Sequence, residues 1–361
     1  MEQPGIGRLV VEDFKRGQHG RTLRRDLRDI YRFYLSEAER ERLASMRPVK
    51  RWFWILWWLA RNLLRRLSPN RRLILVLAAL LFFVRPQWEY ETVRIDLDGS
   101  RLAFPLGVLV LALELKDKLL ARDEIEVARQ VQISLQPKSD PKLPGWEIAS
   151  ATIPANDVGG DLIDYLEGAG GCLGVALGDV AGKGMGAALL CAKLQATLHA
   201  LAPGATSLEA LGAALNGVLE RSGLDNRYAT LFYAEIAAGS GEVRYLNAGH
   251  NPALHISDGA IATLPASSLP LGMLPGTAYG SGALRLSPGD LVVLYSDGIT
   301  EATASSGVEF GLDRLQASIR AASTLPVAEL VGRVIEDVRE FLDHEKPHDD
   351  QSLLVLRRTT A

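Results

Sequence analysis

The chain has 361 residues, more than a single domain usually contains, so we expect one large core and an accessory region. Its formal net charge is only −3, which argues against a nucleic-acid binder whose affinity comes from neutralising phosphates. The two cysteines, Cys172 and Cys191, form no CxxC motif and have no histidine cluster near them, which excludes a disulfide framework and argues against a zinc site.

Residues 1 to 113 form a basic and apolar N-terminal region. The first fifty residues are charged, have a partly helical pattern and lack the arrangement of a signal peptide, so we expect a cytoplasmic catalytic part. The run from Arg51 to Leu67 mixes tryptophan with arginine, a composition typical of a helix in a membrane interface. Membrane contact is therefore predicted for residues 51 to 113.

Two uncharged apolar runs of 12 residues follow, Leu73 to Val84 and Leu102 to Leu113. A spanning helix needs about 20 residues, and Leu73 to Tyr90 approaches this length only if Arg85 and Glu89 lie at the headgroups. Two interpretations stay open. One is a hairpin associated with the inner face of the cell membrane, and the other is a small soluble core packed on the next domain.

Residues 114 to 136 are predicted to form a helical connector. Leu113, Leu120 and Val127 are spaced by seven, and neither glycine nor proline occurs before Pro137. The heptad pattern is too short to establish a coiled coil. The connector is either a simple packing helix or a signalling helix that can pair two copies into a homodimer.

Residues 137 to 361 are predicted to form an α+β domain. Three helical stretches lie near residues 187–201, 207–221 and 327–341. Short apolar stretches separated by glycine predict strands at residues 146–153, 172–179, 230–236, 242–249, 252–257, 290–297 and 352–358. This order indicates antiparallel sheets flanked by helices.

Aspartates stand beside glycine or a second aspartate at four strand ends of this domain. They are Asp161, Asp179, Asp297 and the pair Asp349 and Asp350. One Asp-Gly is usually an ordinary turn, but four in one domain indicate carboxylates that converge. Converging carboxylates repel one another unless cations lie among them, and Mg²⁺ and Mn²⁺ prefer oxygen ligands. The pattern predicts a two-metal hydrolytic site.

Five motifs occur here in a fixed order: VGGDLIDY, LGDVAGKGMGAALL, NAGHNP, LYSDGITEA and DDQSLLVL. With them, the chain from about Ala128 to Arg357 closely resembles the SpoIIE/RsbU-type branch of the bacterial metal-dependent, type 2C-like serine/threonine protein phosphatases. The resemblance implies an αββα sandwich of two mainly antiparallel sheets, with two Mn²⁺ or Mg²⁺ ions at one edge. It also implies hydrolysis of phosphoserine or phosphothreonine by a metal-activated water, without a phosphoenzyme.

The resemblance further implies which residues hold the metals and carry the reaction. They are Asp161, Asp179, Asp297, one acid of the Asp349–Asp350 pair with Asp349 favoured, and the backbone carbonyl of Val180. Asp164 is expected to support this set rather than to ligate directly.

Four positions limit the resemblance or invite other roles. Ala181 stands where eukaryotic type 2C enzymes place a histidine, and no phosphate-binding arginine lies just upstream of Asp161, so the general acid stays unassigned. His250 is interpreted as a structural hydrogen-bonding residue. Lys183 is not a P-loop lysine, because the glycine spacing is wrong and no serine or threonine follows it.

The resemblance implies a phosphorylated partner, a STAS-type anti-sigma-factor antagonist or a similar signalling regulator. Two alternatives stay open: another phosphoprotein substrate, and a catalytically inactive signalling scaffold with the same fold. All the acidic motifs are retained, which favours the enzyme.

Overall fold

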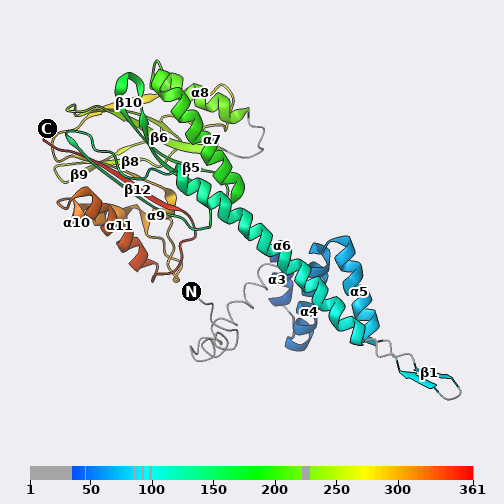
Figure 1. Cartoon of the computed structure of the whole chain (residues 1–361). Helices are drawn as coiled ribbons and strands as arrows, with labels where there is room; N and C mark the ends of the chain where they lie inside the picture. The colour runs from blue at the N-terminus through cyan, green and yellow to red at the C-terminus, as the bar shows by residue number, and fades with distance from the viewer. Residues whose placement is uncertain are drawn as a thin grey trace, which may run out of the picture. The chain divides into compact units, whose positions relative to one another are not determined.

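The computed structural model describes residues 35–44, 46–83, 87–90, 93–96, 100–221 and 228–360 (Figure 1). The chain divides into two compact units, Met1–Leu120 and Ala121–Ala361, which are described separately. Most of the predicted charged segment over residues 1 to 50, and Arg85, lie outside the described residues.

The first unit is mainly helical, and its described elements are α3 (Glu37–Ala44), α4 (Pro48–Arg66), α5 (Pro69–Phe83), β1 (Gln87–Tyr90), β2 (Val93–Asp96) and the start of α6 (Ser100–Leu135). Strands β1 and β2 pair in an antiparallel hairpin. Leu35, Leu43 and Trp58 form a small buried cluster around α3 and α4. Among the described residues of this unit, the partly buried Trp54, Ile55 and Leu59 also pack against this cluster, which remains small.

Helix α6 contains residues of both units. The predicted boundary between the second apolar run and the connector, at Leu113 and Glu114, lies inside this one helix. Pro105 and Gly107 lie in its first two turns and do not interrupt it. The change in composition at residue 114 therefore does not coincide with a break in the backbone, since no helix breaker occurs there.

The second unit contains two antiparallel five-stranded sheets. One has the order β10-β7-β6-β5-β4 and is built from β4 (Asp161–Glu167), β5 (Leu173–Val180), β6 (Ala229–Ile236), β7 (Glu242–Ala248) and β10 (Ser281–Arg285). The other has the order β3-β12-β11-β8-β9 and is built from β3 (Trp146–Ile153), β8 (Ala253–Ser257), β9 (Ala260–Leu264), β11 (Leu291–Tyr295) and β12 (Gln351–Arg358).

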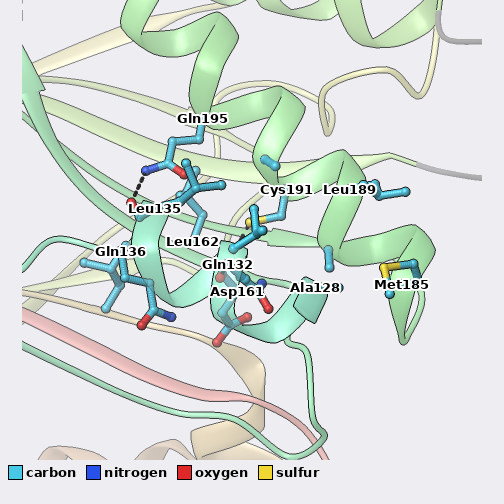
Figure 2. A pocket seen from close by; sticks show the side chains of 14 residues that line it. Ala128, Gln132, Leu135, Gln136, Asp161, Leu162, Met185, Leu189, Cys191 and Gln195 are labelled. Atoms are coloured by element: carbon cyan, nitrogen blue, oxygen red, sulfur yellow. Dashed lines mark hydrogen bonds between the residues drawn. The ribbon is translucent and has the colours of Figure 1, made fainter. Parts of the chain in front are cut away.

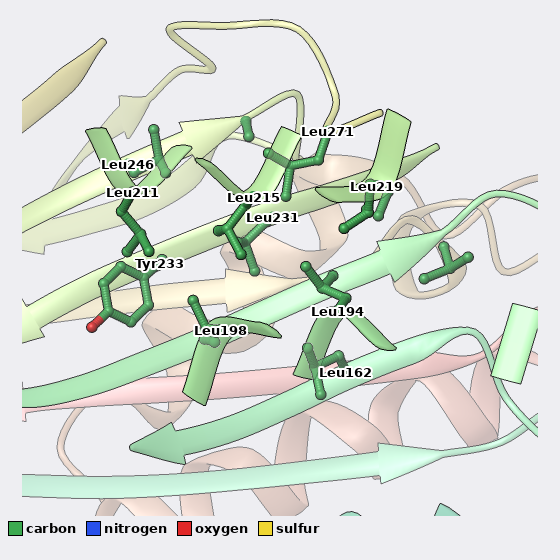
Figure 3. Close-up of a cluster of buried hydrophobic side chains, with 14 of the residues drawn as sticks. Leu162, Leu194, Leu198, Leu211, Leu215, Leu219, Leu231, Tyr233, Leu246 and Leu271 are labelled. Carbon is green, nitrogen blue, oxygen red and sulfur yellow. The ribbon is translucent and has the colours of Figure 1, made fainter. Parts of the chain in front are cut away.

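Helices cover the outer face of each sheet. They are α7 (Met185–Leu201) and α8 (Leu208–Glu220) on the first sheet, and α9 (Asp297–Thr300), α10 (Gly311–Ala322) and α11 (Val327–Phe341) on the second, with short 3₁₀ turns at Ala169–Gly171 and Ala202–Gly204. Figure 3 shows leucines of α7 and α8 meeting Leu231 and Tyr233 of β6 in the first outer core. A further core of Val175, Phe232, Leu354 and their neighbours joins the two sheets.

Residue patterns explain these layers. Helix α11 buries Val327, Leu330, Val331, Val334 and Val338, the spacing that places apolar side chains on one helical face. Strand β11 is buried along its whole length, because it lies inside its sheet between β8 and β12 and is covered on both faces. The predicted αββα sandwich is confirmed.

All seven predicted strands correspond to strands of the two sheets, but three strands and two helices of the second unit, α9 and α10, were not predicted. Strand β4 begins at the aspartate of the Gly-Gly-Asp motif, which resembles a loop. Strands β9 and β10 lie at sheet edges and alternate partly buried with exposed residues, so their apolar signal is weak. Helix α10 has only three large apolar residues, Leu312, Leu315 and Ile319, among charged and small ones, and α9 has only four residues in all.

Candidate metal centre

The predicted aspartates lie at one edge of the paired sheets. Asp161 opens β4 and is the direct cross-strand neighbour of Asp179 in β5. On the second sheet, Asp297 follows β11, and the pair Asp349 and Asp350 precedes β12, the neighbouring strand. Each sheet thus contributes acidic residues from two adjacent strands, and the packing of the two sheets gathers residues that are up to 189 positions apart in the sequence.

Asp350 ties the two sheets together through its side chain. Its Oδ1 accepts a hydrogen bond from the backbone N–H of Ala155 at 2.7 Å, and its Oδ2 accepts one from Gly160 at 2.6 Å. The hydroxyl of Ser296 donates to the Asp350 carbonyl at 3.1 Å. Asp350 therefore positions the loop before Asp161, and both of its carboxylate oxygens are already engaged.

Two glycines permit this close approach. A side chain at Gly298 would overlap the backbone carbonyl of Asp350, and a Cβ at Gly159 would lie 2.7 Å from Asp350 Oδ2. Both contacts are closer than van der Waals contact. A larger residue at Gly298 would push the ends of β11 and β12 apart within the second sheet, and one at Gly159 would push the loop before β4 away from Asp350. The glycines beside the aspartates are thus needed for packing as well as for turning the chain.

Burial and mutual repulsion raise the pKa values of these carboxyl groups. Burial, followed by the charges of Asp179 and Asp350, holds the pKa of Asp161 well above its usual range. Burial, followed by the charges of Asp297, Asp349 and Asp350, raises the pKa of Asp179 to about 6. Burial and the charge of Asp349 also raise the pKa of Asp297. The edge is a region of negative potential that favours protons or metal cations.

The donor chemistry at this edge fits Mg²⁺ or Mn²⁺. Asp161 Oδ2 is buried and has no hydrogen-bond partner among the described residues. This oxygen therefore has lone pairs that a metal cation could accept. Asp349 is half-exposed, and its Oδ2 lies 3.0 Å from the Nζ of Lys183, a cation already attracted to the cluster. Within the described ranges, no three His, Cys, Asp or Glu side chains are arranged as a ready ligand set.

Val180 and Asp164, the two remaining residues of the predicted set, lie at different distances from the acidic edge. The Val180 N–H donates to the Gly160 carbonyl at 3.2 Å, which brings the backbone of Val180 beside the Asp161 corner. Asp164 is buried further along β4, where its Oδ2 lies 2.6 Å from His199 Nε2 of α7. Asp164 therefore joins the helix to the sheet, consistent with a supporting role.

His250 lies behind the acidic edge. Its Nδ1 is 2.8 Å from the hydroxyl of Thr230, which is the cross-strand neighbour of Asp179, and its N–H donates to Asn247 at 2.8 Å. Complete burial lowers the pKa of His250 to about 4, so the ring is neutral at physiological pH. This geometry fits the structural interpretation of His250.

The end of α6 contacts the same corner. The side-chain amide of Gln132 donates to the Gly159 carbonyl at 2.7 Å and accepts from the Gly159 N–H at 3.0 Å. Gln195 of α7 donates to the Leu135 carbonyl at 2.7 Å. Figure 2 shows these side chains around an apolar cavity of about 180 Å³, which Asp161 also lines. The last turns of α6 are therefore part of the support of the acidic edge.

Comparisons with known proteins agree with this architecture. The model of the Stage II sporulation protein E (SpoIIE) family matches residues 169–359, more than half of the chain. The chain belongs to the SpoIIE family.

Related proteins of this family include phosphoserine phosphatase RsbU of Bacillus subtilis (strain 168), which is 30% identical over 66% of this chain and 70% of RsbU. Protein IcfG of Synechocystis sp. is 28% identical over 69% of this chain, which spans only 43% of IcfG. The SiaA-PP2C domain of Pseudomonas aeruginosa shares the fold, with a TM-score of 0.58 at 20% identity over 67% of this chain and 98% of that domain.

The SpoIIE resemblance identified the aspartates but not their supports. Gln132, Ser296 and the Lys183–Asp349 ion pair were not predicted. The position of Lys183, close after Asp179 in the sequence, could have indicated that it lies near the acidic edge. Gln132 had no such indication, because a glutamine on a polar helix is normally a solvated residue.

Proposed function

We propose that the chain is a metal-dependent phosphoserine/phosphothreonine protein phosphatase. The observation that carries this proposal is the convergence of Asp161, Asp179, Asp297 and Asp349 at the edge of a sandwich of the SpoIIE family. Membership of that family and the similarity to RsbU support the activity.

We assign Asp161, Asp179, Asp297 and Asp349 as the residues that hold two Mn²⁺ or Mg²⁺ ions, with the carbonyl of Val180 beside them. When bound, such ions activate water and offset negative charge on the phosphoryl oxygens. Asp350 is assigned a positioning role, since its two oxygens accept the N–H groups of Ala155 and Gly160. Asp349 is the more exposed acid of the Asp349–Asp350 pair; its Oδ1 accepts the Asp350 N–H at 3.0 Å and its Oδ2 faces Lys183. It is better suited to be a ligand than the buried Asp350.

The proposed substrate is a phosphorylated signalling regulator, such as a STAS-type anti-sigma-factor antagonist. Similarity to RsbU and to the phosphoserine phosphatase RsbP supports this class. The solved RsbU and RsbW domains of Rv1364c from Mycobacterium tuberculosis, 27% identical with a TM-score of 0.52 over 63% of each chain, also support it. The cytoplasmic location of the catalytic unit and a homodimer through α6 stay predictions.

The test is hydrolysis of a phosphoserine peptide and of p-nitrophenyl phosphate by the detergent-purified full chain, with and without Mn²⁺. We expect turnover that requires metal and that falls about a hundredfold or more in Asp179→Asn and Asp297→Asn, because each removes a charged ligand. Asp313→Asn, an exposed acid on α10, is the matched control and should keep full activity.

Calorimetric titration with Mn²⁺ separates the two main alternatives. Metal binding without turnover on either substrate would indicate an inactive scaffold. Turnover that is unchanged in both site variants would contradict the assigned centre, whatever the activity of the chain.

A further inference from the structure

Helix α5 and the first four turns of α6 form a helical hairpin. In contrast to the core of a soluble domain, this hairpin buries small side chains and leaves most large apolar side chains exposed. The two helices line a common groove, where Ala78 of α5 and Ala103 of α6 are buried. Large apolar side chains, among them Phe82, Phe104 and Leu111, line the same groove and stay exposed. The contact between the two helices therefore buries small residues and leaves most of the large ones uncovered.

Most large apolar side chains of this hairpin stay exposed, including several that line the groove. Leu80 is 61% exposed and Phe83 is 83% exposed on α5, and Phe104 and Leu111 are 76% and 69% exposed on α6. No charged residue occurs from Leu73 to Phe83 or from Leu102 to Leu113. A helix that is apolar on all sides is stable only where its surroundings are apolar too.

The exposed apolar residues lie on more than one face of each helix. On α5, Leu73 and Phe82 are both exposed, although nine positions of an α-helix place them on opposite sides. A second copy of the chain would cover one side and leave the other in water. A surrounding solvent of hydrocarbon covers all sides at once, which favours a lipid bilayer over a dimer partner.

The charges next to the hairpin fit the same environment. At its base, the guanidinium of Arg71 contacts Glu114 at 2.7 Å and Asp117 at 2.6 Å, so the first charges beyond the apolar runs neutralise one another. Helix α4 contains five basic residues and no acidic one, and it exposes Trp52, Phe53 and Trp57. Basic residues combined with tryptophan favour an interface that carries anionic headgroups.

We infer that the α5–α6 hairpin inserts into an anionic lipid bilayer while α4 lies at its surface. This inference concerns the first unit and does not depend on the proposed phosphatase activity. Each apolar run of 12 residues covers about 18 Å against roughly 30 Å of hydrocarbon, and local thinning accommodates a mismatch of this kind. Within the described residues, only Met185–Gly204 meets length and hydropathy limits for a full crossing, and it contains α7, a core helix of the second unit.

The test is cell-free synthesis of the full chain with vesicles of phosphatidylcholine and phosphatidylglycerol, followed by flotation and an alkaline carbonate wash. We expect the chain to float and to resist the wash. A triple variant, Leu77→Asn, Leu80→Asn and Leu109→Asn, should lower the floating fraction about tenfold, because outward polar groups oppose transfer into hydrocarbon. Pure phosphatidylcholine vesicles should bind several-fold less chain.

A matched variant, Met273→Asn with Leu274→Asn, changes exposed apolar residues of the second unit and should float like the original chain. Resistance to limited proteolysis of residues 121–361 checks that each variant is folded. The inference is overturned if the original chain stays monodisperse at the bottom of the gradient, as a dimer covered by its own copy would. It is equally overturned if the triple variant floats unchanged.

Discussion

The two units of the chain place their apolar side chains in opposite ways. In the second unit, Leu215 and Tyr233 are completely buried between α8, α7 and the first sheet. In the first unit, Leu80 and Phe83 are largely exposed, and the buried residues of the α5–α6 hairpin include Ala78 and Ala103. Both units are rich in leucine, so leucine content alone does not distinguish them. The comparison teaches that an apolar run does not by itself say which of its side chains will be buried.

The largest expected effect separates the two kinds of leucine. Leu215→Ala should lower the free energy of unfolding of the second unit by about 2–5 kcal/mol, since it leaves a cavity in a closed core. Leu80→Ala should change the free energy of unfolding of its own unit, the first, by less than about 0.5 kcal/mol, because the side chain is already exposed. Guanidinium unfolding of the full chain in detergent, followed by near-ultraviolet circular dichroism, measures both. Equal losses in the two variants would contradict the contrast between the units.

A buried polar group gives the next effect. His250 has a folded-state pKa of about 4, below its unfolded value of about 6.5, so the folded state disfavours the protonated ring. The stability that the neutral ring contributes is fully present above pH 6.5 and is lost as the pH drops from 6.5 towards 4, where the loss reaches about 3 kcal/mol.

Unfolding between pH 4 and 7 measures this contribution as the difference between the original chain and His250→Gln. The difference is needed because the raised pKa values of Asp161 and Asp179 change stability in the opposite direction. His344→Asn, an exposed histidine with a φ of +58°, is the control and should leave the pH dependence unchanged. A pH-independent difference for His250→Gln would refute the buried neutral ring.

Helix α6 provides a comparison within one element. Gln132→Ala removes both hydrogen bonds to Gly159 and should cost about 1–2 kcal/mol in docking the helix end, with faster amide exchange at Gly159 and Gly160. Gln130→Ala, at an exposed position two residues earlier, should have no such effect. Hydrogen exchange measured by mass spectrometry compares the two variants at Gly159 and Gly160. Equal exchange in both variants would mean that Gln132 does not support the acidic edge.

The smallest effect is expected at the exposed ion pair of the site. Lys183 and Asp349 are 59% and 53% exposed, and the lysine competes with a metal cation for the same carboxylate. Lys183→Met should therefore tighten Mn²⁺ binding by about two- to fivefold in calorimetric titration, with little change in stability. Lys116→Met, a similarly exposed lysine of the first unit, is the control. Weaker Mn²⁺ binding in Lys183→Met would instead mean that the lysine holds Asp349 in place.

Sequence patterns alone were enough to predict the family, the αββα architecture and the aspartates that converge at the sheet edge. These features are local: an apolar run predicts a strand, and an ordered set of Asp and Gly motifs marks the strand ends. Strands β9 and β10 escaped prediction because edge strands bury few side chains and carry little periodic signal.

The contacts of the aspartates come from the tertiary structure alone. Asp349 and Asp350 are adjacent and chemically identical, yet the N–H groups of Ala155 and Gly160 engage Asp350 and leave Asp349 facing Lys183. The tertiary structure also shows that the apolar runs leave leucine and phenylalanine exposed and bury Ala78 and Ala103. Both outcomes depend on contacts between residues far apart in the chain, and local sequence patterns contain no information about which partner will lie opposite.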